Sequence, residues 1–196
     1  MYRKLYIICC IAMLIGILVG CKPNTYQPKP YGYFRIELPE HSYVSLDTIE
    51  YYTTNISKYC EVNNSTSEFI ATSDHWINLF YPELNATIHL SYKKITPEIF
   101  QTVSEENRTL AYKHTVRADA IAESFFANDT TRTYCMLFEM KGNAASPVQF
   151  FITDSTENFL RGSLYFNNIP NADSIAPSSI YVEQDIIELI EQLRWK

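Results

Sequence analysis

Four strand-like runs separated by turn-forming residues fill positions 120–167, and this pattern constrains the fold more than any other part of the sequence. The runs are residues 120–128, 131–141, 148–154 and 159–167. Their connections contain Asn128-Asp129, Gly142-Asn143 and Asp154-Ser155, which favour reverse turns. Consecutive strands joined by such short turns pair antiparallel, because parallel neighbours need a long crossover. The second half of the chain is therefore predicted to be an antiparallel meander.

Two segments outside the meander have the periodicity of amphipathic helices. The first begins at Thr96-Pro97-Glu98, with a capping Thr, Pro at the first helical position and Glu in the first turn. Its expected buried residues are Ile99, Phe100, Val103, Leu110 and Ala111. The second helix is expected over residues 179–194, after a loop at 168–177. Its expected buried residues are Val182, Ile186, Leu189, Ile190 and Leu193.

The first half contains further strand candidates. Residues 32–38 alternate apolar and polar side chains up to Pro39, and residues 51–62 have an extended pattern. Residues 75–81 and 86–92 are predicted to form a strand pair. Strands in runs, with helices outside them, indicate an α+β domain whose largely antiparallel sheet is covered by helices. The order of elements resembles the PsbP/Mog1 kind of sandwich, which is an analogy of fold alone.

The amino terminus has the pattern of a bacterial lipoprotein signal peptide. A short positive region at residues 1–4 precedes residues 5–20, which carry no charge. Leu18-Val19-Gly20-Cys21 then fits the lipobox, in which small residues enter a peptidase cleft and the cysteine thiol takes a diacylglycerol. The alternative is an uncleaved anchor helix, but the uncharged run falls short of the roughly 20 residues that span a bilayer. Cleavage before Cys21, and lipid attachment to it, are predicted.

Three segments follow from this boundary. Residues 1–20 are the signal peptide, residues 21–31 are the lipidated cysteine with a Pro-rich tether, and residues 32–196 form one globular domain. Lys22 after the cysteine, in place of an Asp, favours the outer membrane, and the absence of an acidic pair behind it favours the periplasmic face. The formal charge of −6, without a dense Lys/Arg cluster, argues against nucleic acid as a partner. The lipid is thus the expected membrane attachment.

Two cysteines remain in the mature domain, Cys60 and Cys135. In an oxidising compartment they could form one disulfide. The alternative is that both are buried, unpaired small residues. The spacing does not decide between them.

The sequence contains no recognisable catalytic or cofactor motif. None of the four histidines has metal-ligand spacing, and there is no nucleophile elbow, phosphate-binding loop or dinucleotide fingerprint. Tyr112-Lys113-His114 could form a general-base site with Asp119, but a polar helix end explains the same residues. Residues 142–146 could be a docking loop or a plain hairpin connection. No catalytic residue, metal or cofactor is therefore predicted.

Several blocks resemble the gliding motility lipoprotein GldD family of Bacteroidetes. They are Pro28-Lys29-Pro30-Tyr31-Gly32-Tyr33-Phe34-Arg35-Ile36, Ile88-His89-Leu90-Ser91-Tyr92, Arg108-Thr109-Leu110-Ala111-Tyr112-Lys113-His114-Thr115-Val116, Lys141-Gly142-Asn143-Ala144-Ala145-Ser146 and Phe159-Leu160-Arg161-Gly162-Ser163-Leu164-Tyr165-Phe166. The blocks run in order over nearly the whole mature chain. One departure is Tyr31, where a basic residue is expected.

The resemblance implies a noncatalytic envelope lipoprotein of the gliding machinery and of the coupled type nine protein secretion system. Its implied role is assembly or stabilisation, and its implied partners are other gliding and secretion lipoproteins. The alternative is a periplasmic binding module for a lipid, glycan or peptide, whose sign would be an apolar, aromatic-lined pocket between sheet and helices. An enzyme would instead need a cleft where titratable side chains converge.

Four of the seven Asp residues precede Ser or Thr in a pattern that resembles Bacteroidetes O-glycosylation sequons. The acceptor residues are Thr48, Thr130, Ser155 and Ser174. All four are expected in turns, where an enzyme could reach the hydroxyl. Asp-Ser and Asp-Thr also form turns readily, which explains part of the enrichment. At least one of the four is predicted to carry a glycan.

Overall fold

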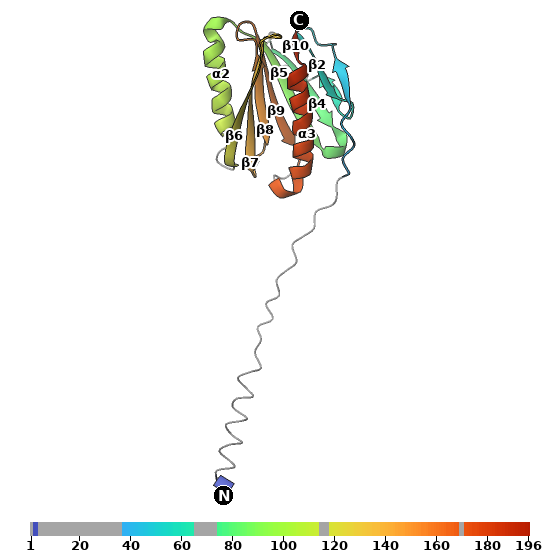
Figure 1. The fold of residues 1–196 in the computed structure, drawn as a ribbon, viewed down its shortest axis with the longest axis vertical. Helices are drawn as coiled ribbons and strands as arrows, with labels where there is room; N and C mark the ends of the chain where they lie inside the picture. The colour runs from blue at the N-terminus through green and yellow to red at the C-terminus, as the bar shows by residue number, and fades with distance from the viewer. Residues whose placement is uncertain (1, 4–36, 65–73, 114–117, 169–170) are drawn as a thin grey trace. The chain divides into compact units, whose positions relative to one another are not determined.

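A computed structural model of the chain describes residues 2–3, 37–64, 74–113, 118–168 and 171–196 (Figure 1). The chain divides into two compact units, Met1–Phe34 and Arg35–Lys196, and the sheets and helices below belong to the second. Cys21, the tether and most of the strand expected at 32–38 lie outside the described residues. Residues 37–42 have no regular secondary structure.

A seven-stranded sheet forms the centre of the second unit. Its strands are β3 (Glu61–Asn64), β4 (Asp74–Tyr81), β5 (Ala86–Lys94), β6 (Ala118–Asn128), β7 (Thr133–Gly142), β8 (Val148–Thr153) and β9 (Asn158–Phe166). Their order is β3-β4-β5-β9-β8-β7-β6, and every neighbouring pair is antiparallel. The predicted meander and the strand pair β4–β5 are confirmed. Pairing of β5 with β9 joins the two, and the α+β class is confirmed.

A second, three-stranded sheet has the order β1-β2-β10. Its strands are β1 (Tyr43–Leu46), β2 (Tyr52–Ser57) and β10 (Arg194–Trp195). The prediction of one extended segment over residues 51–62 was wrong, because β2 and β3 belong to different sheets. A tight turn separates them, in which the backbone N–H of Cys60 donates to the carbonyl of Ser57 at 3.3 Å.

Helix α3 (Ala172–Gln192) begins earlier than expected, because an Asn cap outweighs the helix-breaking tendency of Pro177. The Asn171 side chain accepts a hydrogen bond from the backbone N–H of Ser174 at 3.3 Å, and Asn143 accepts one from Ala172 at 2.8 Å. The loop predicted at 168–177 is therefore shorter than expected. The five predicted core residues are all buried: Val182, Ile186, Leu189, Ile190 and Leu193.

Helix α2 (Pro97–Tyr112) begins at the predicted cap residue Thr96. Of its expected buried stripe, Val103 and Ala111 are buried and Phe100 is half-buried. Ile99 and Leu110 were predicted wrongly, since both are about 40% exposed. The reason is the helical period: residues 100, 103, 107 and 111 share one face, whereas 99 and 110 lie on its flank.

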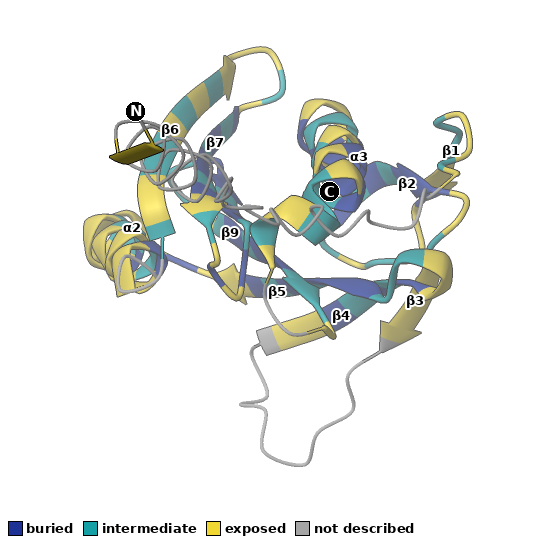
Figure 2. Ribbon diagram, turned by 90° about the horizontal axis from the view of Figure 1, so that it is seen from below, coloured by how far each residue is buried: buried dark blue, intermediate teal, exposed yellow. Residues whose placement is uncertain are grey.

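The two helices lie on opposite faces of the large sheet. Helix α3 and the small sheet cover one face (Figure 2). The largest cluster of buried apolar side chains lies between them and this face. Helix α2 covers part of the other face through two smaller clusters around Phe138 and Phe159.

Between β4 and β5, the single turn η1 (Pro82–Leu84) ends at Asn85 in the left-handed region (φ 49°).

Candidate docking site

Strand β6 is the last strand of the large sheet. It pairs with β7 on one side, and its other edge pairs with no strand in the described part of the chain. The strand is 11 residues long, and Asp119 and Glu123 are its only charged residues. Most soluble proteins shorten or charge such an edge, because its free N–H and C=O groups can pair with another chain. The β6 edge is therefore a place where another polypeptide could add a strand.

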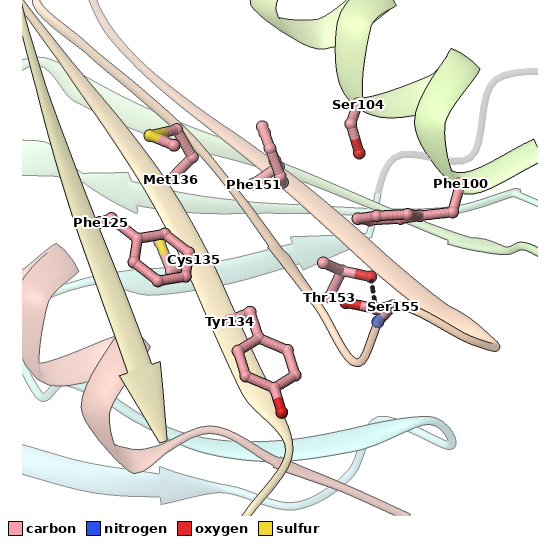
Figure 3. Close-up of a pocket in the computed structure, with 9 residues that line it drawn as sticks. All are labelled: Phe100, Ser104, Phe125, Tyr134, Cys135, Met136, Phe151, Thr153 and Ser155. Atoms are coloured by element: carbon pink, nitrogen blue, oxygen red, sulfur yellow. Dashed lines mark hydrogen bonds between the residues drawn. The ribbon is translucent and has the colours of Figure 1, made fainter. Parts of the chain in front are cut away.

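An apolar pocket of about 330 Å³ lies beside this edge, between helix α2 and strands β6 to β8 (Figure 3). It is lined by Phe100, Ser104, Phe125, Tyr134, Cys135, Met136, Phe151, Thr153 and Ser155. Phe125, Met136 and Phe151 stand in one row across three strands, since Phe125 pairs with Met136 and Met136 with Phe151. The pocket and the strand edge form one surface, which we call the β6 docking site.

The side chain of Phe125 is 65% exposed, although it belongs to this apolar row. An aromatic residue gains about 1.5–3 kcal/mol when it is fully buried. Folding of the described residues therefore leaves much of that stabilisation unrealised at Phe125. A partner that covered the ring would gain it on binding.

Polar interactions fix both ends of the β6 docking site. At one end, Glu123 of β6 accepts hydrogen bonds from Tyr112 and from Arg108 of α2, the latter at 3.1 Å. At the other end, the Asp154 carboxylate accepts three backbone N–H bonds within the turn before β9. Burial alone would raise the pKa of Asp154, but these bonds hold it below its usual range. The walls of the site are therefore held in place before any partner arrives.

Three of the four residues that could form a general-base site are described, and each has contacts of its own. Tyr112 bonds to Glu123, and Lys113 caps the end of α2. His114 lies outside the described residues. Asp119 lies beside Gly142 at the bulge of β6. The arrangement shown here is a helix end tied to an edge strand.

The other histidines are spread over the domain. His41 pairs with Asp185, His75 with the Tyr51 hydroxyl, and His89 with Asn78. Within the described ranges, no group of three His, Cys, Asp or Glu side chains could hold a metal ion.

Cys60 and Cys135 are both free thiols in the structure, so the alternative of two unpaired residues is the one it shows. The Cys60 thiol donates to the carbonyl of Ser57 at 3.1 Å. Burial, followed by the nearby Asp185 carboxylate, raises the pKa of Cys60 to about 12. Burial also raises the pKa of Cys135. Neither thiol has the lowered pKa of a nucleophile.

The predicted glycan acceptors differ in accessibility. Thr48 and Thr130 are exposed in non-helical connections. Ser155 is half-buried in a turn with φ 65°. Ser174 lies in the first turn of α3, where its hydroxyl donates to the Asn171 carbonyl at 3.0 Å, so the expectation of a turn was wrong for this residue.

The segment 142–146 comprises the last residue of β7 and most of the connection to β8. Its Asn143 side chain holds the start of α3, and its buried Ser146 hydroxyl donates to the Val148 carbonyl at 3.3 Å. These contacts belong to a hairpin connection within the domain. Sequence reasoning did not find the β6 docking site, since the exposed Phe125 had no distinguishing signal along the chain.

The fold and this surface define an α+β domain with an open sheet edge beside an apolar pocket, the kind of surface that binds polypeptides. The family model described as gliding motility lipoprotein GldD matches residues 23–195, and the chain belongs to this family. The predicted resemblance is confirmed over residues 23–195. Among curated proteins, no match was found. None of the helices in the described ranges has the length and apolarity that crossing a bilayer requires.

Proposed function

We propose that this protein is a noncatalytic docking component of the gliding machinery and of the coupled type nine secretion system. Lipid on Cys21 holds it at the outer membrane, facing the periplasm, where it assembles or stabilises other envelope lipoproteins. The single observation that carries the docking role is the open edge of β6 beside an apolar pocket. Family membership supports the gliding context.

The mode of docking follows from the two parts of the site. An extended partner segment adds a strand to β6, so that backbone hydrogen bonds supply affinity, and one apolar side chain enters the pocket to supply specificity. A volume of about 330 Å³ is at the small end of the range for ligand pockets and suits one large side chain. A lipid could fill the pocket but could not satisfy the backbone groups along β6.

Site-specific photo-crosslinking in intact cells tests this mode. A photoreactive residue in place of Ala127, exposed on β6, should capture an envelope protein. The matched position is Val44, which is exposed on β1 of the small sheet. Equal capture from both positions, or capture from neither, contradicts docking at β6.

Gliding and secretion can be compared between a variant within the β6 docking site and a variant outside it. Phe125→Asp should abolish gliding or cargo secretion while the level of the lipoprotein stays normal, because the ring is largely exposed. Ile180→Asp, on an equally exposed apolar residue of α3, should leave both intact. Cys21→Ala should move the protein away from the membrane fraction. Normal secretion with Phe125→Asp contradicts the proposal.

A periplasmic binding module for a lipid, glycan or peptide is the second candidate function. Its expected sign, an apolar pocket lined by aromatic side chains between sheet and helix, is present at Phe100, Phe125 and Phe151. Native protein extracted from its host and analysed for bound small molecules distinguishes the two. A stoichiometric acyl compound, beyond the lipid on Cys21, favours the second function.

A further inference from the structure

The large sheet carries a second pocket of about 310 Å³. It is lined by Trp76, His89, Leu90, Ser91, Arg161, Ser163 and Tyr165, from strands β4, β5 and β9. The register explains why these residues meet. Trp76 pairs with Ser91, and Ser91 with Arg161, in one row across the sheet. His89 and Ser163 pair in the next row.

Arg161 is a half-buried cation without a carboxylate partner in the described part of the chain. Its guanidinium donates to Oε1 of Gln149 at 3.2 Å, whereas the ion pairs found there are His41–Asp185 and Arg108–Glu123. Burial lowers the pKa of the Arg161 guanidinium, which nevertheless stays charged at neutral pH. Proteins rarely bury a cation without an anion, because desolvation opposes the charge. An acidic ligand would supply the missing partner.

Gln149, which accepts that Arg161 hydrogen bond, has a donor without an acceptor. Its side chain is 2% exposed, and its Nε2 atom has no hydrogen-bond partner. Its Oε1 atom accepts the Arg161 hydrogen bond and its backbone lies opposite Ser163, so the amide lies next to the pocket without lining it. A buried donor without an acceptor is rare and costs about 1–3 kcal/mol. Gln149 is a neutral partner, so it does not supply the anion that Arg161 lacks.

The remaining lining residues favour a ligand rich in hydroxyl groups. Nδ1 of His89 lies 2.7 Å from Oδ1 of Asn78, and burial lowers the pKa of this histidine, so its Nε2 atom is a free acceptor in the neutral ring. Trp76, which lines the pocket, is 43% exposed. Tyr165 also lines it and lies edge-on to His89, with ring centres 5.6 Å apart. Donors, one acceptor and exposed aromatic faces are thus combined.

We propose that this pocket binds an acidic saccharide. The sugar carboxylate pairs with Arg161, a ring hydroxyl donates to His89, and the apolar face of the ring lies on Trp76. A metal ion would be repelled by the guanidinium, and a neutral acyl chain would leave the guanidinium without a charged partner. The proposal rests on β4, β5, β8 and β9 and is independent of docking at β6.

Calorimetric titration of the detergent-solubilised mature lipoprotein tests the proposal. The probes are trigalacturonate, the neutral trisaccharide maltotriose and the acidic peptide triglutamate. Trigalacturonate should bind saturably, with a Kd of about 1 mM or tighter. Maltotriose should bind at least about tenfold more weakly, because it lacks the carboxylate that matches Arg161.

Matched variants locate the binding. Arg161→Gln and Trp76→Ala should each weaken trigalacturonate binding about tenfold, which corresponds to roughly 1.4 kcal/mol. Trp76 is exposed, so its variant stays informative even where Arg161→Gln impairs folding. Arg132→Gln removes an exposed cation elsewhere and should leave binding unchanged. Tighter binding of triglutamate, unchanged binding in both pocket variants, or no saturable binding of trigalacturonate overturns the proposal.

Discussion

The Nδ1 atom of His41 lies 2.7 Å from Oδ1 of Asp185, a carboxylate that is only 2% exposed. The second carboxylate oxygen accepts a hydrogen bond from the Tyr81 hydroxyl at 3.0 Å. Burial and the Asp185 carboxylate together raise the pKa of Tyr81 and of Tyr43, so both phenols remain donors. The His41 ring also stacks on Tyr181, with ring centres 4.2 Å apart. This cluster joins the segment before β1 to α3 and β4.

Removal of the central acceptor should destabilise the domain strongly. Asp185→Ala leaves His41 and Tyr81 without their partner inside the protein, and we expect a loss of about 2–4 kcal/mol in the free energy of unfolding. Urea denaturation of the mature chain measures it. Glu191→Ala, an exposed acid on the same helix, should change stability by less than about 0.5 kcal/mol. Equal effects from both variants would mean that the cluster contributes no specific stability.

A second stability prediction concerns the contact between Gly162 and Phe150. A Cβ atom placed on Gly162 would lie 2.1 Å from the Phe150 ring, which packs over the glycine across the β8–β9 pair. Gly162→Ala must displace a fully buried ring, and we expect a cost of about 1–3 kcal/mol. The double variant with Phe150→Leu should recover part of that loss, since the smaller side chain leaves room. Thermal unfolding measures both, and additive losses would exclude the steric explanation.

The elements that could be predicted are those specified by residues close together in the sequence. The meander was predictable because turn residues separate its strands, and the core side of α3 followed from the period of Val182, Ile186 and Leu189. Strands β1 and β10 were not predictable. They span four and two residues, and they exist because both pair with β2. The sequence predicts no strand at Trp195, because no nearby residue indicates that Trp195 pairs with Tyr52.

The two surfaces needed the order and register of the strands. Phe125 becomes an edge residue because β9 pairs with β5, which leaves β6 at the end of the sheet. Trp76 and Arg161 are far apart in sequence, yet both pair with Ser91. Such relationships depend on nonlocal pairing, which composition and periodicity do not encode. The lipobox, by contrast, is a local sequence motif, so lipid attachment to Cys21 could be predicted without the structure.

Stability should also depend on pH through Glu183 of α3. Burial and a hydrogen bond with Glu139 of β7 raise the pKa of Glu183 from its ordinary 4.5 to about 7. Between these pH values the folded chain keeps a proton that the unfolded chain has lost, so stability falls as pH rises from about 4.5 to 7. Because Glu183 is partly exposed, solvent screening reduces the expected change to the order of 1 kcal/mol.

Glu183→Gln keeps the hydrogen bond and removes the titration. The variant should match the wild type near pH 4 and exceed its stability near pH 8 by on the order of 1 kcal/mol. Unfolding curves at several pH values check the difference. Glu191→Gln is the matched exposed control and should follow the wild type throughout. If the stability difference between Glu183→Gln and the wild type were the same at every pH, the substitution would act through packing and not through titration.

Glycan attachment should follow the accessibility of the four candidate hydroxyls. Thr48 and Thr130 are exposed, whereas the Ser174 hydroxyl bonds to the Asn171 carbonyl and the backbone of Ser155 is held by Thr153. A transferase needs a free hydroxyl on a chain that it can approach. We therefore expect native protein to exceed the mass of the lipidated polypeptide.

The location of that extra mass can be tested with paired variants in the native host. Thr48→Ala combined with Thr130→Ala should remove it, while Ser155→Ala combined with Ser174→Ala should keep it. Intact-mass measurement reads both outcomes directly. A mass equal to that of the lipidated polypeptide in the wild type would exclude glycosylation at all four residues. Loss of the extra mass only in the serine pair would show that the enzyme acts before α3 and the β8–β9 turn have folded.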